Sequence, residues 1–180
     1  SLKRYESEAQ VACIHGYIYP ITGMPEQFFV RGADCWGWAT WLRAWAIFEK
    51  DGQKLLNEGV KRGMETEADF NGSYGYTQML RDQIAGKNNS WAIRWYFSAF
   101  LRNMLCLYPG KSYIQNIGND SSGTHCKSTD SYQVELNDSL SGLKIPVEEN
   151  LYARKLMEKY FLGLKENIFV RLLRKIKGFI

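Results

Sequence analysis

The six tryptophans of this chain are its most distinctive candidates for ligand binding. They fall into two groups, Trp36, Trp38, Trp41 and Trp45 in the first and Trp91 with Trp95 in the second. Flat indole faces complement the C–H faces of a sugar ring, and Trp36 and Trp38 stand beside an expected strand-to-helix junction, where ligands of α/β proteins commonly bind. The alternative, which applies above all to Trp41 and Trp45, is that the indoles pack two helices together.

Asp34 is the carboxylate closest to the first tryptophan group, within Arg31-Gly-Ala-Asp-Cys-Trp-Gly-Trp38. A carboxylate flanked by apolar groups can act as a general base toward a hydroxyl group, which makes Asp34 a candidate catalytic residue. Aspartate is equally favoured as a helix N-cap, and Asp34 is well placed to cap a helix that begins at Trp36. The sequence leaves both interpretations open.

The two histidines have different sequence surroundings. His15 lies in an apolar, β-branched segment and is expected to be a core residue with satisfied hydrogen bonds. His125 ends a loop rich in Gly, Ser and Asn, where its side chain is free to reach a metal ion or a phosphate.

The cysteines are Cys13, Cys35, Cys106 and Cys126. Their scattered spacing favours buried thiols in a reducing compartment over a zinc site or a disulfide framework.

Composition and motifs exclude several classes of protein. The 180 residues are 45% hydrophobic and 23% charged, which is typical of one folded domain, and no apolar run approaches the length of a membrane-spanning helix. The patterns G-x-G-x-x-G, G-x-x-x-x-G-K-[S/T] and Asp-x-Asp are absent, so the usual nucleotide anchors are missing. The G-x-S-x-G pattern is absent as well, which leaves a hydrolase without a nucleophile.

The hydrophobic pattern predicts the elements that must position these residues. Strands are expected at 11–20 and 27–31, as a pair at 104–108 and 111–118 around Pro109-Gly110, and at 132–136. Helices are expected from Trp36 to a stop at Gly52, within 53–89 with a stop at Gly86, over 91–103 with Ser90 as N-cap, and from Pro146 onward with Glu148 and Glu149 in the first turn. The first ten residues are compatible with a helix. The pattern indicates one α/β domain without an internal linker.

The basic character of the chain lies in its C-terminal segment. The whole chain carries 23 basic and 19 acidic side chains, and residues 151–180 hold eight of the former and two of the latter. Arg171, Arg174 and Lys175 recur at i, i+3 and i+4, and apolar residues occupy the other positions, which is typical of a basic amphipathic helix. We expect residues 166–180 either to contact an anionic membrane surface or to dock on a domain. Nucleic-acid binding is not expected, because the basic residues do not extend over the rest of the chain.

Two sequence blocks resemble bacterial glycosyltransferases of family two, some of which are labelled hemolytic-protein-like. The first is Phe28-Phe-Val-Arg-Gly-Ala-Asp-Cys-Trp-Gly-Trp-Ala-Thr-Trp-Leu-Arg-Ala-Trp45. The second is Asn89-Ser-Trp-Ala-Ile-Arg-Trp-Tyr96, which continues through Leu107-Tyr-Pro-Gly-Lys-Ser to Asn116-Ile-Gly-Asn-Asp-Ser-Ser-Gly-Thr-His-Cys126. The resemblance covers residues 10–126 and implies the C-terminal part of a GT-A fold, a mixed sheet flanked by helices. It suggests that residues 1–146 are the acceptor-side half of the domain, that residues 147–180 are a helical tail, and that Ser1 is an artificial start.

The resemblance also implies roles for particular residues. Trp36 to Trp45 would hold the donor sugar and the acceptor, with Arg43 at the place of a usual arginine, and the second block would add Trp91 and Arg94 as substrate-binding residues. Trp91 and Ala92 stand where many relatives have an acidic pair, so either the catalytic base lies elsewhere, with Asp34 as the candidate, or catalysis is altered or absent. His125 would complete the site of a divalent cation, Mn²⁺ or Mg²⁺.

Three functions follow as hypotheses. The first is transfer of a sugar from a nucleotide-diphosphate donor to a hydroxyl group of a glycan or lipid-linked acceptor during polysaccharide assembly, at the cytoplasmic face of the cell membrane. The second is a carbohydrate-binding module without catalysis. The third is a membrane-active protein that acts through its basic C-terminal segment.

Overall fold

A computed structural model describes residues 1–115, 133–139 and 143–177, with side chains up to residue 165. The strands are β1 (Val11–His15), β2 (Gln27–Arg31), β3 (Trp38–Thr40) and β4 (Leu105–Pro109). The α-helices are α1 (Leu42–Trp45), α2 (Gly52–Lys61), α3 (Glu65–Ala68), α4 (Tyr76–Ile84), α5 (Trp91–Phe100) and α6 (Leu151–Lys177), and a short 3-10 helix covers Lys3–Tyr5. The prediction of an α/β chain is confirmed.

The sheet is mixed, with the strand order β2-β4-β1-β3. β4 runs parallel to β1 and antiparallel to β2, and β3 pairs with β1 in the antiparallel direction. β1 and β4 are the two inner strands, and four of five and all five of their residues are buried, respectively. Strands that are covered on both faces read as continuous apolar runs, which is why both were recognisable in the sequence.

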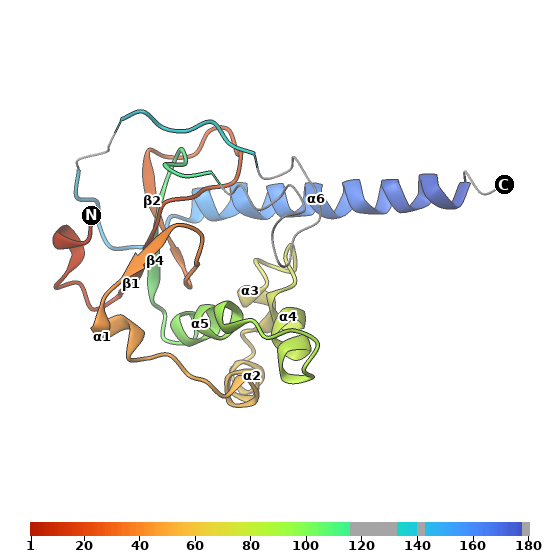
Figure 1. Cartoon of the computed structure of the whole chain (residues 1–180), viewed down its shortest axis with the longest axis horizontal. Coiled ribbons are helices and arrows are strands. Elements are labelled where there is room, and N and C mark those ends of the chain that lie inside the picture. Colours follow the sequence, from red (N-terminus) through yellow and green to blue (C-terminus); the bar gives the residue numbers. More distant parts are fainter. Residues whose placement is uncertain (116–132, 140–142, 178–180) are drawn as a thin grey trace.

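Helices α2, α4 and α5 pack on one another and lie together below the sheet in Figure 1, with α5 nearest to β4. α5 is the most buried of the three, because seven of its ten residues are buried. Its N-terminus is capped as predicted, since the Ser90 hydroxyl oxygen accepts a hydrogen bond from the Ile93 backbone nitrogen at 3.3 Å. Gly86 has a φ of +72° just after α4, which confirms the predicted stop.

The predicted helix from Trp36 to Gly52 is wrong. The segment forms the edge strand β3, the single helical turn α1 and an irregular stretch. Gly37 has a φ of +57°, which a right-handed helix does not allow, and a Cβ atom there would overlap the Ile114 side chain. Gly52 begins α2 instead of ending a helix, because the Asp51 carboxylate accepts hydrogen bonds from the backbone nitrogens of Gln53 and Lys54.

Four other predicted elements differ from the structure. The first strand ends at His15, and residues 16–20 form no strand. Residues 111–115 and 133–136 form no strand, and the rest of the two predicted strands lies outside the described residues. The last helix begins at Leu151 and not at Pro146. The Asn150 side-chain oxygen caps that helix by accepting a hydrogen bond from the Ala153 backbone nitrogen at 2.9 Å. Because Glu148 and Glu149 precede the helix, they do not occupy its first turn.

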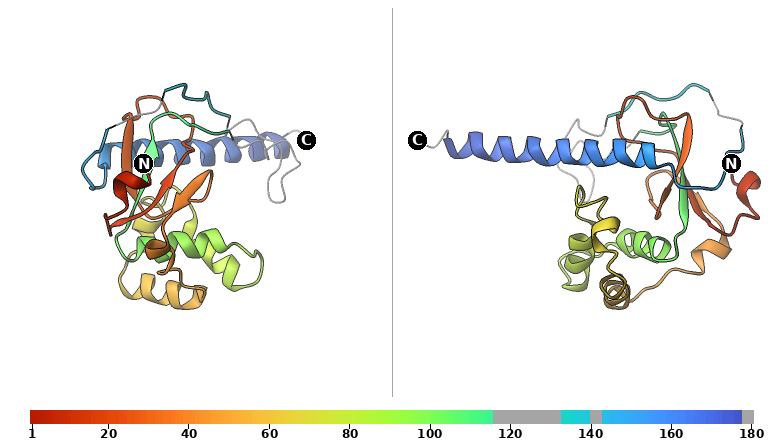
Figure 2. Two further views of the ribbon diagram at one scale, coloured as in Figure 1. Left: turned by 60° about the vertical axis from the view of Figure 1, so that its left-hand side comes forward. Right: turned by 180° about the vertical axis from the view of Figure 1, so that it is seen from behind.

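Helix α6 joins the domain at one end and continues beyond the rest of the described chain (Figures 1 and 2). Ala153, Met157 and Phe161 are buried in the main core, so the first turns of the expected tail belong to the folded domain. Within the described residues, no helix combines the length and apolar character that a membrane crossing requires.

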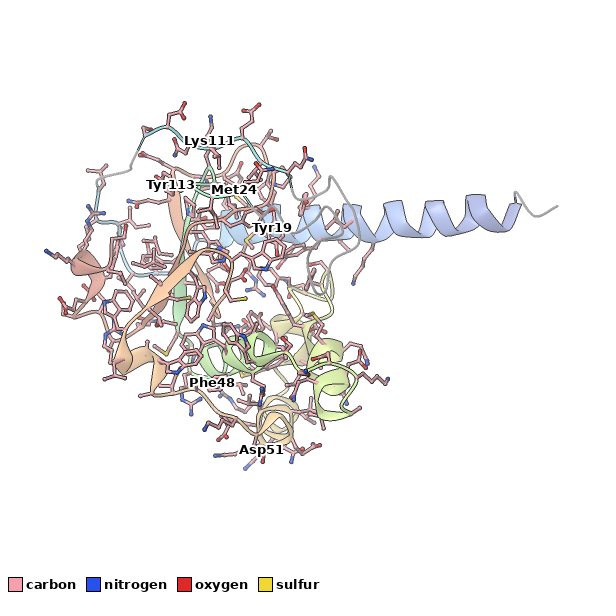
Figure 3. All side chains as sticks on the ribbon, in the orientation of Figure 1. Tyr19, Met24, Phe48, Asp51, Lys111 and Tyr113 are labelled. Atoms are coloured by element: carbon pink, nitrogen blue, oxygen red, sulfur yellow. The ribbon has the colours of Figure 1, made fainter. Side chains whose placement is uncertain are left out.

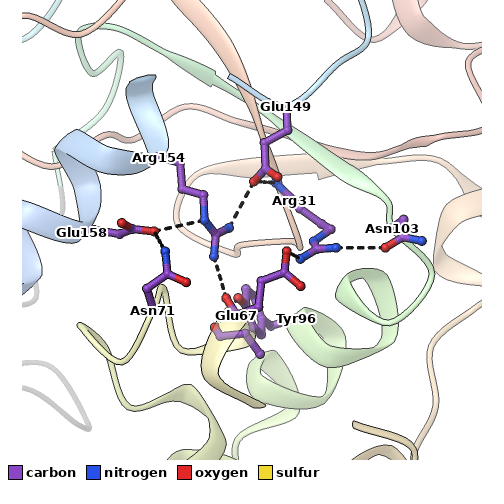
Figure 4. A network of polar contacts seen from close by, with 9 residues as sticks. Arg31, Glu67, Asn71, Tyr96, Asn103, Glu149, Arg154 and Glu158 are labelled. Carbon is purple, nitrogen blue, oxygen red and sulfur yellow. Dashed lines mark hydrogen bonds and ion pairs between the residues drawn. The ribbon is translucent and has the colours of Figure 1, made fainter. Parts of the chain in front are cut away.

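A buried arginine fastens α6 to the sheet and to α3 (Figure 4). Arg154 is 5% exposed, and its guanidinium group lies 3.1 Å from the Glu149 carboxylate and 3.2 Å from the Glu158 carboxylate. The Arg154 guanidinium also donates a hydrogen bond to the Glu67 carbonyl oxygen, and Glu67 forms an ion pair with Arg31 of β2. The network therefore fixes three elements relative to one another.

Candidate functional site

A pocket of about 550 Å³ lies where the loop after β2 meets the first turns of α4 and α5. Asp34, Trp36 and Trp91 line this pocket, so the structure brings together three of the residues proposed from the sequence. Further lining residues come from three other segments, namely Tyr19, Tyr74, Tyr76, Met79, Asn88 and Asn89. Figure 3 shows the position of Tyr19, whose ring contacts Tyr160 and Phe161 of α6.

Two glycines define the loop that carries Asp34 and Trp36. Gly32 has a φ of +111°, and a Cβ atom at this position would lie 2.6 Å from Cε2 of Tyr96 in α5. Gly37 has a positive φ at the other end of the loop. Because other residues rarely adopt these conformations, the two glycines let the chain leave β2, pass over α5 and return as β3.

The Asp34 carboxylate is partly exposed and is held by hydrogen bonds at both oxygens. One oxygen accepts a hydrogen bond from the Cys35 backbone nitrogen at 2.7 Å, and the other accepts one from the Tyr108 hydroxyl group at 3.3 Å. Burial and the Asp34 charge raise the pKa of Tyr108 well above its ordinary value, so the phenol remains a hydrogen-bond donor. The Asp34 side chain is 21% exposed. Its remaining lone pairs can therefore accept a proton or a hydrogen bond from a ligand.

Asp34 caps no helix at Trp36, because no helix begins there. Of the two interpretations of this residue, the capping role is therefore excluded. Its side chain instead lines the pocket together with Trp36 and Trp91.

His15 is a buried structural residue, as predicted. Its Nε2 atom accepts a hydrogen bond from the Trp36 backbone nitrogen at 2.8 Å, and its Nδ1 atom lies 2.7 Å from the Tyr17 carbonyl oxygen. An acceptor at Nε2 requires the proton on Nδ1, so the neutral Nδ1–H tautomer satisfies both bonds. Nε2 is 3.7 Å from the nearest Asp34 oxygen, but in this tautomer it carries no proton to share.

Cys35 lines the same pocket but is not a nucleophile. Burial, the negative charge of Asp34 and the proximity of Cys13 raise the pKa of the Cys35 thiol to about 12. The thiolate is the nucleophilic form of cysteine, and at neutral pH it is almost absent. Cys13, Cys35 and Cys106 are free thiols, as expected, while Cys126 lies outside the described residues.

Trp36 and Trp91 are the two tryptophans that a ligand in the pocket can reach. Trp36 packs edge-on against Tyr17, with 5.0 Å between the ring centroids. Trp91 is 41% exposed at the start of α5 and leans on Trp38, at a centroid distance of 5.7 Å. A sugar ring can stack on such partly exposed indoles without any rearrangement of the core.

The other tryptophans pack the protein together. Trp38 and Trp45 contact the fully buried Trp95 at centroid distances of 6.1 and 5.1 Å, so both belong to an indole cluster in the core. Trp41 packs on the opposite side of the sheet, against the smaller core that contains Tyr5. Neither Trp38 nor Trp41 lines this pocket, and Trp38 instead lines a smaller pocket of about 270 Å³ with His15 and Tyr108. The substrate-binding role expected for Trp38 and Trp41 stays a prediction.

Arg43 and Arg94 bind the backbone and do not line the pocket. The Arg43 guanidinium donates hydrogen bonds to the carbonyl oxygens of Tyr5, Glu6 and Val11 at 2.9–3.0 Å, and it stacks over the Trp41 ring. Arg94 donates to the Lys50 carbonyl oxygen at 2.9 Å. Arg43 thus holds the N-terminal segment in place, and Arg94 holds the stretch that precedes α2.

Two tyrosines of the pocket were not singled out from the sequence. Tyr74 precedes α4 and Tyr76 is its first residue, and their ring centroids are 4.5 Å apart. Burial, with smaller contributions from Tyr19 and Asp34, raises the pKa of Tyr76 well above its ordinary value, so this phenol keeps its proton. A dense group of tyrosines beside glycines was the available signal in the sequence.

The described residues do not fit a metal ion. No group of three or more His, Cys, Asp or Glu side chains gathers in this part of the chain, and both nitrogens of His15 are engaged. His125, the expected metal ligand, lies outside the described residues.

No family model, no curated protein and no solved structure matches this chain. Its own fold and pocket therefore define it as a mixed α/β chain with an aromatic-lined pocket that contains one carboxylate.

Proposed function

We propose that this chain is the acceptor-binding part of a glycosyltransferase that uses a nucleotide-diphosphate sugar. The supporting observation is the pocket itself, in which the Asp34 carboxylate shares one cavity with the accessible indoles of Trp36 and Trp91. Indoles recognise the apolar faces of sugars, while carboxylates and amides recognise their hydroxyl groups. The resemblance of the two tryptophan-containing blocks to family-two glycosyltransferases points to the same class.

In the proposed reaction Asp34 acts on the hydroxyl group of the acceptor. The Asp34 carboxylate takes the proton while the acceptor oxygen attacks the anomeric carbon of the donor. The bond from that carbon to the diphosphate oxygen breaks, and the nucleoside diphosphate leaves with the bonding electrons. Tyr108 and the Cys35 backbone nitrogen hold the Asp34 carboxylate in place during this step.

The divalent cation remains an expectation from the resemblance. It would stabilise the charge of the leaving diphosphate in the intact enzyme. The described residues offer no set of ligands for it.

The test compares Asp34→Asn and Trp36→Ala in the full-length enzyme, with labelled nucleotide sugars and a glycan extract as acceptor. General base catalysis contributes about 100-fold or more, so Asp34→Asn should reduce kcat by at least that factor. Trp36→Ala should mainly raise KM for the acceptor. Asp51→Asn is the matched control, because Asp51 caps α2 outside the pocket and asparagine caps equally well. If both site variants transfer the sugar at the wild-type rate, the assignment of Asp34 and Trp36 to the acceptor site is contradicted.

A carbohydrate-binding module without catalysis is the second candidate. It is favoured by Trp91 and Ala92, which stand where the resembling enzymes carry an acidic pair, and by the single carboxylate among the residues that line the pocket. A glycan array probed without nucleotide distinguishes the two functions. Tight glycan binding together with no transfer from any nucleotide sugar would favour the module.

We also propose that residues 166–180 anchor the chain to an anionic membrane surface. The supporting observations are the basic composition of residues 151–180 and the continuation of α6 beyond the rest of the described chain (Figure 1). Binding to vesicles of phosphatidylglycerol and phosphatidylcholine should disappear when residues 166–180 are deleted. Undiminished binding of the shortened chain would contradict this assignment.

A further inference from the structure

Tyr76 stands out among the pocket residues because its hydroxyl group has no hydrogen-bond partner in the described part of the chain. Its ring is fixed, since it stacks on the Tyr96 ring with a centroid distance of 4.2 Å and an interplanar angle of 23°. The Tyr96 hydroxyl group, in contrast, donates a hydrogen bond to the Ala68 carbonyl oxygen at 2.6 Å. The Tyr96 hydroxyl group is therefore bonded within the fold, whereas the Tyr76 hydroxyl group can bond to a ligand.

The charge of the pocket restricts that ligand. Asp34 alone carries a charge among the described residues that line the pocket, and the others are aromatic, apolar or uncharged polar side chains. An acidic sugar would place a second negative charge in this partly enclosed space without a lining cation to pair with it. An uncharged sugar carries hydroxyl groups that can donate to the carboxylate and accept from a phenol.

We propose that Tyr76 and Asp34 together bind two hydroxyl groups of an uncharged sugar, with Tyr76 as donor and Asp34 as acceptor. This inference rests on the proposed function, and it adds a residue that determines specificity and a substrate class. Uronic acids and phosphorylated sugars are rejected by the carboxylate. The protonated phenol supports this division of roles, because burial keeps the pKa of Tyr76 well above neutral pH.

Saturation-transfer NMR tests the proposal on the 180-residue chain with two matched pairs of probes. Each pair is a neutral methyl pyranoside and its C6 carboxylate, one pair from the glucose series and one from the galactose series. The wild-type chain should bind at least one neutral glycoside on the order of tenfold more tightly than its carboxylate partner. Asp34→Asn should reduce this difference, because it removes the repelling charge.

Tyr76→Phe removes only the hydroxyl group and keeps the stacked ring. It should weaken binding of the neutral glycoside about five- to tenfold, which corresponds to the loss of one hydrogen bond, with little change in the melting temperature. Tyr5→Phe is the matched control, because the Tyr5 hydroxyl group bonds to Ile145 in the smaller core, away from the pocket, and sugar binding should not change.

The outcomes separate the two levels of the proposal. If no neutral glycoside receives saturation from the wild-type chain, both the proposed carbohydrate binding and the inference about Tyr76 are contradicted. If the wild-type chain binds a neutral glycoside but Tyr76→Phe binds it equally well, or if the carboxylate partner binds as tightly, only the inference is overturned.

Discussion

The Nε2 atom of His15 and the backbone nitrogen of Trp36 are 2.8 Å apart, and this bond ties an inner strand to the loop that forms the pocket. The imidazole ring is buried and also contacts the Tyr108 ring, with a centroid distance of 4.9 Å. Tyr108 in turn holds the Asp34 carboxylate. The two proposed ligand-binding residues of this loop, Asp34 and Trp36, are thus supported from one place on the sheet.

His15→Ala should loosen this support. The variant leaves the Trp36 nitrogen and the Tyr17 carbonyl oxygen without their partners, which costs about 2–4 kcal/mol of the free energy of unfolding. Urea unfolding measures this loss. In the wild-type protein, ¹⁵N chemical shifts of His15 should show a protonated Nδ1 and an unprotonated Nε2. The opposite tautomer would contradict the assigned hydrogen bonds.

The Cys35 thiol gives a prediction about alkaline pH. Its pKa of about 12 in the folded chain lies above the ordinary value of 9.0, so the folded state holds this proton more tightly than the unfolded state. The contribution to stability is therefore complete below pH 9 and is lost as the pH rises toward 12. At pH 9 about one thiol in a thousand is ionised, and alkylation by iodoacetamide should be correspondingly slow. Alkylation of Cys35 at the rate of a free thiol would contradict this environment.

Arg154 should be among the most costly side chains to remove. Arg154→Met keeps most of the side-chain volume but leaves Glu149 and Glu158 without their buried partner, at a cost of about 3–5 kcal/mol. Arg81→Met is a suitable comparison, because the ion pair of Arg81 with Glu65 is exposed and contributes about 0–1 kcal/mol. Both values are obtained from chemical unfolding. Equal losses for the two variants would mean that the Figure 4 network does not fasten α6.

Several local predictions from the sequence were correct because their causes are local. The apolar residues of β2 and the Ser90 cap of α5 depend on neighbours a few positions away, and both are where the sequence placed them. The segment after Trp36 was predicted wrongly, because tryptophans at helical spacing also fit an edge strand followed by one turn. The positive φ of Gly37 decides between them, and it follows from packing against Ile114, which is distant in the sequence.

The kinds of residue in the candidate site were predictable from the sequence, but which individual residues line the pocket was not. Asp34, Trp36 and Trp91 were selected because carboxylates and indoles are informative by type, and the structure places them in one pocket. Arg43 was selected in the same way, but its three carbonyl partners lie in the N-terminal segment, which no local pattern reveals. Tyr76 was missed because the freedom of its hydroxyl group depends on how α4 and α5 meet.

Arg43→Ala should separate a structural role from a binding role. The loss of three hydrogen bonds to the backbone should lower the free energy of unfolding by about 2–3 kcal/mol, since hydrogen bonds from charged groups are the stronger kind. The affinity for neutral methyl glycosides should not change. If the variant binds methyl glycosides more weakly and its free energy of unfolding is unchanged, Arg43 is a binding residue and not a structural one.

The central claim is that a sugar binds in the pocket beside Asp34, against Trp36 and Trp91. Fluorine NMR of the chain labelled with 5-fluorotryptophan tests it most directly, because each of the six tryptophans gives a separate signal that single Trp→Phe variants assign. On titration with neutral methyl glycosides, the signals of Trp36 and Trp91 should shift, while those of the buried Trp95 and the distant Trp41 should not. Shifts confined to Trp41, or no shift with any glycoside, would contradict it.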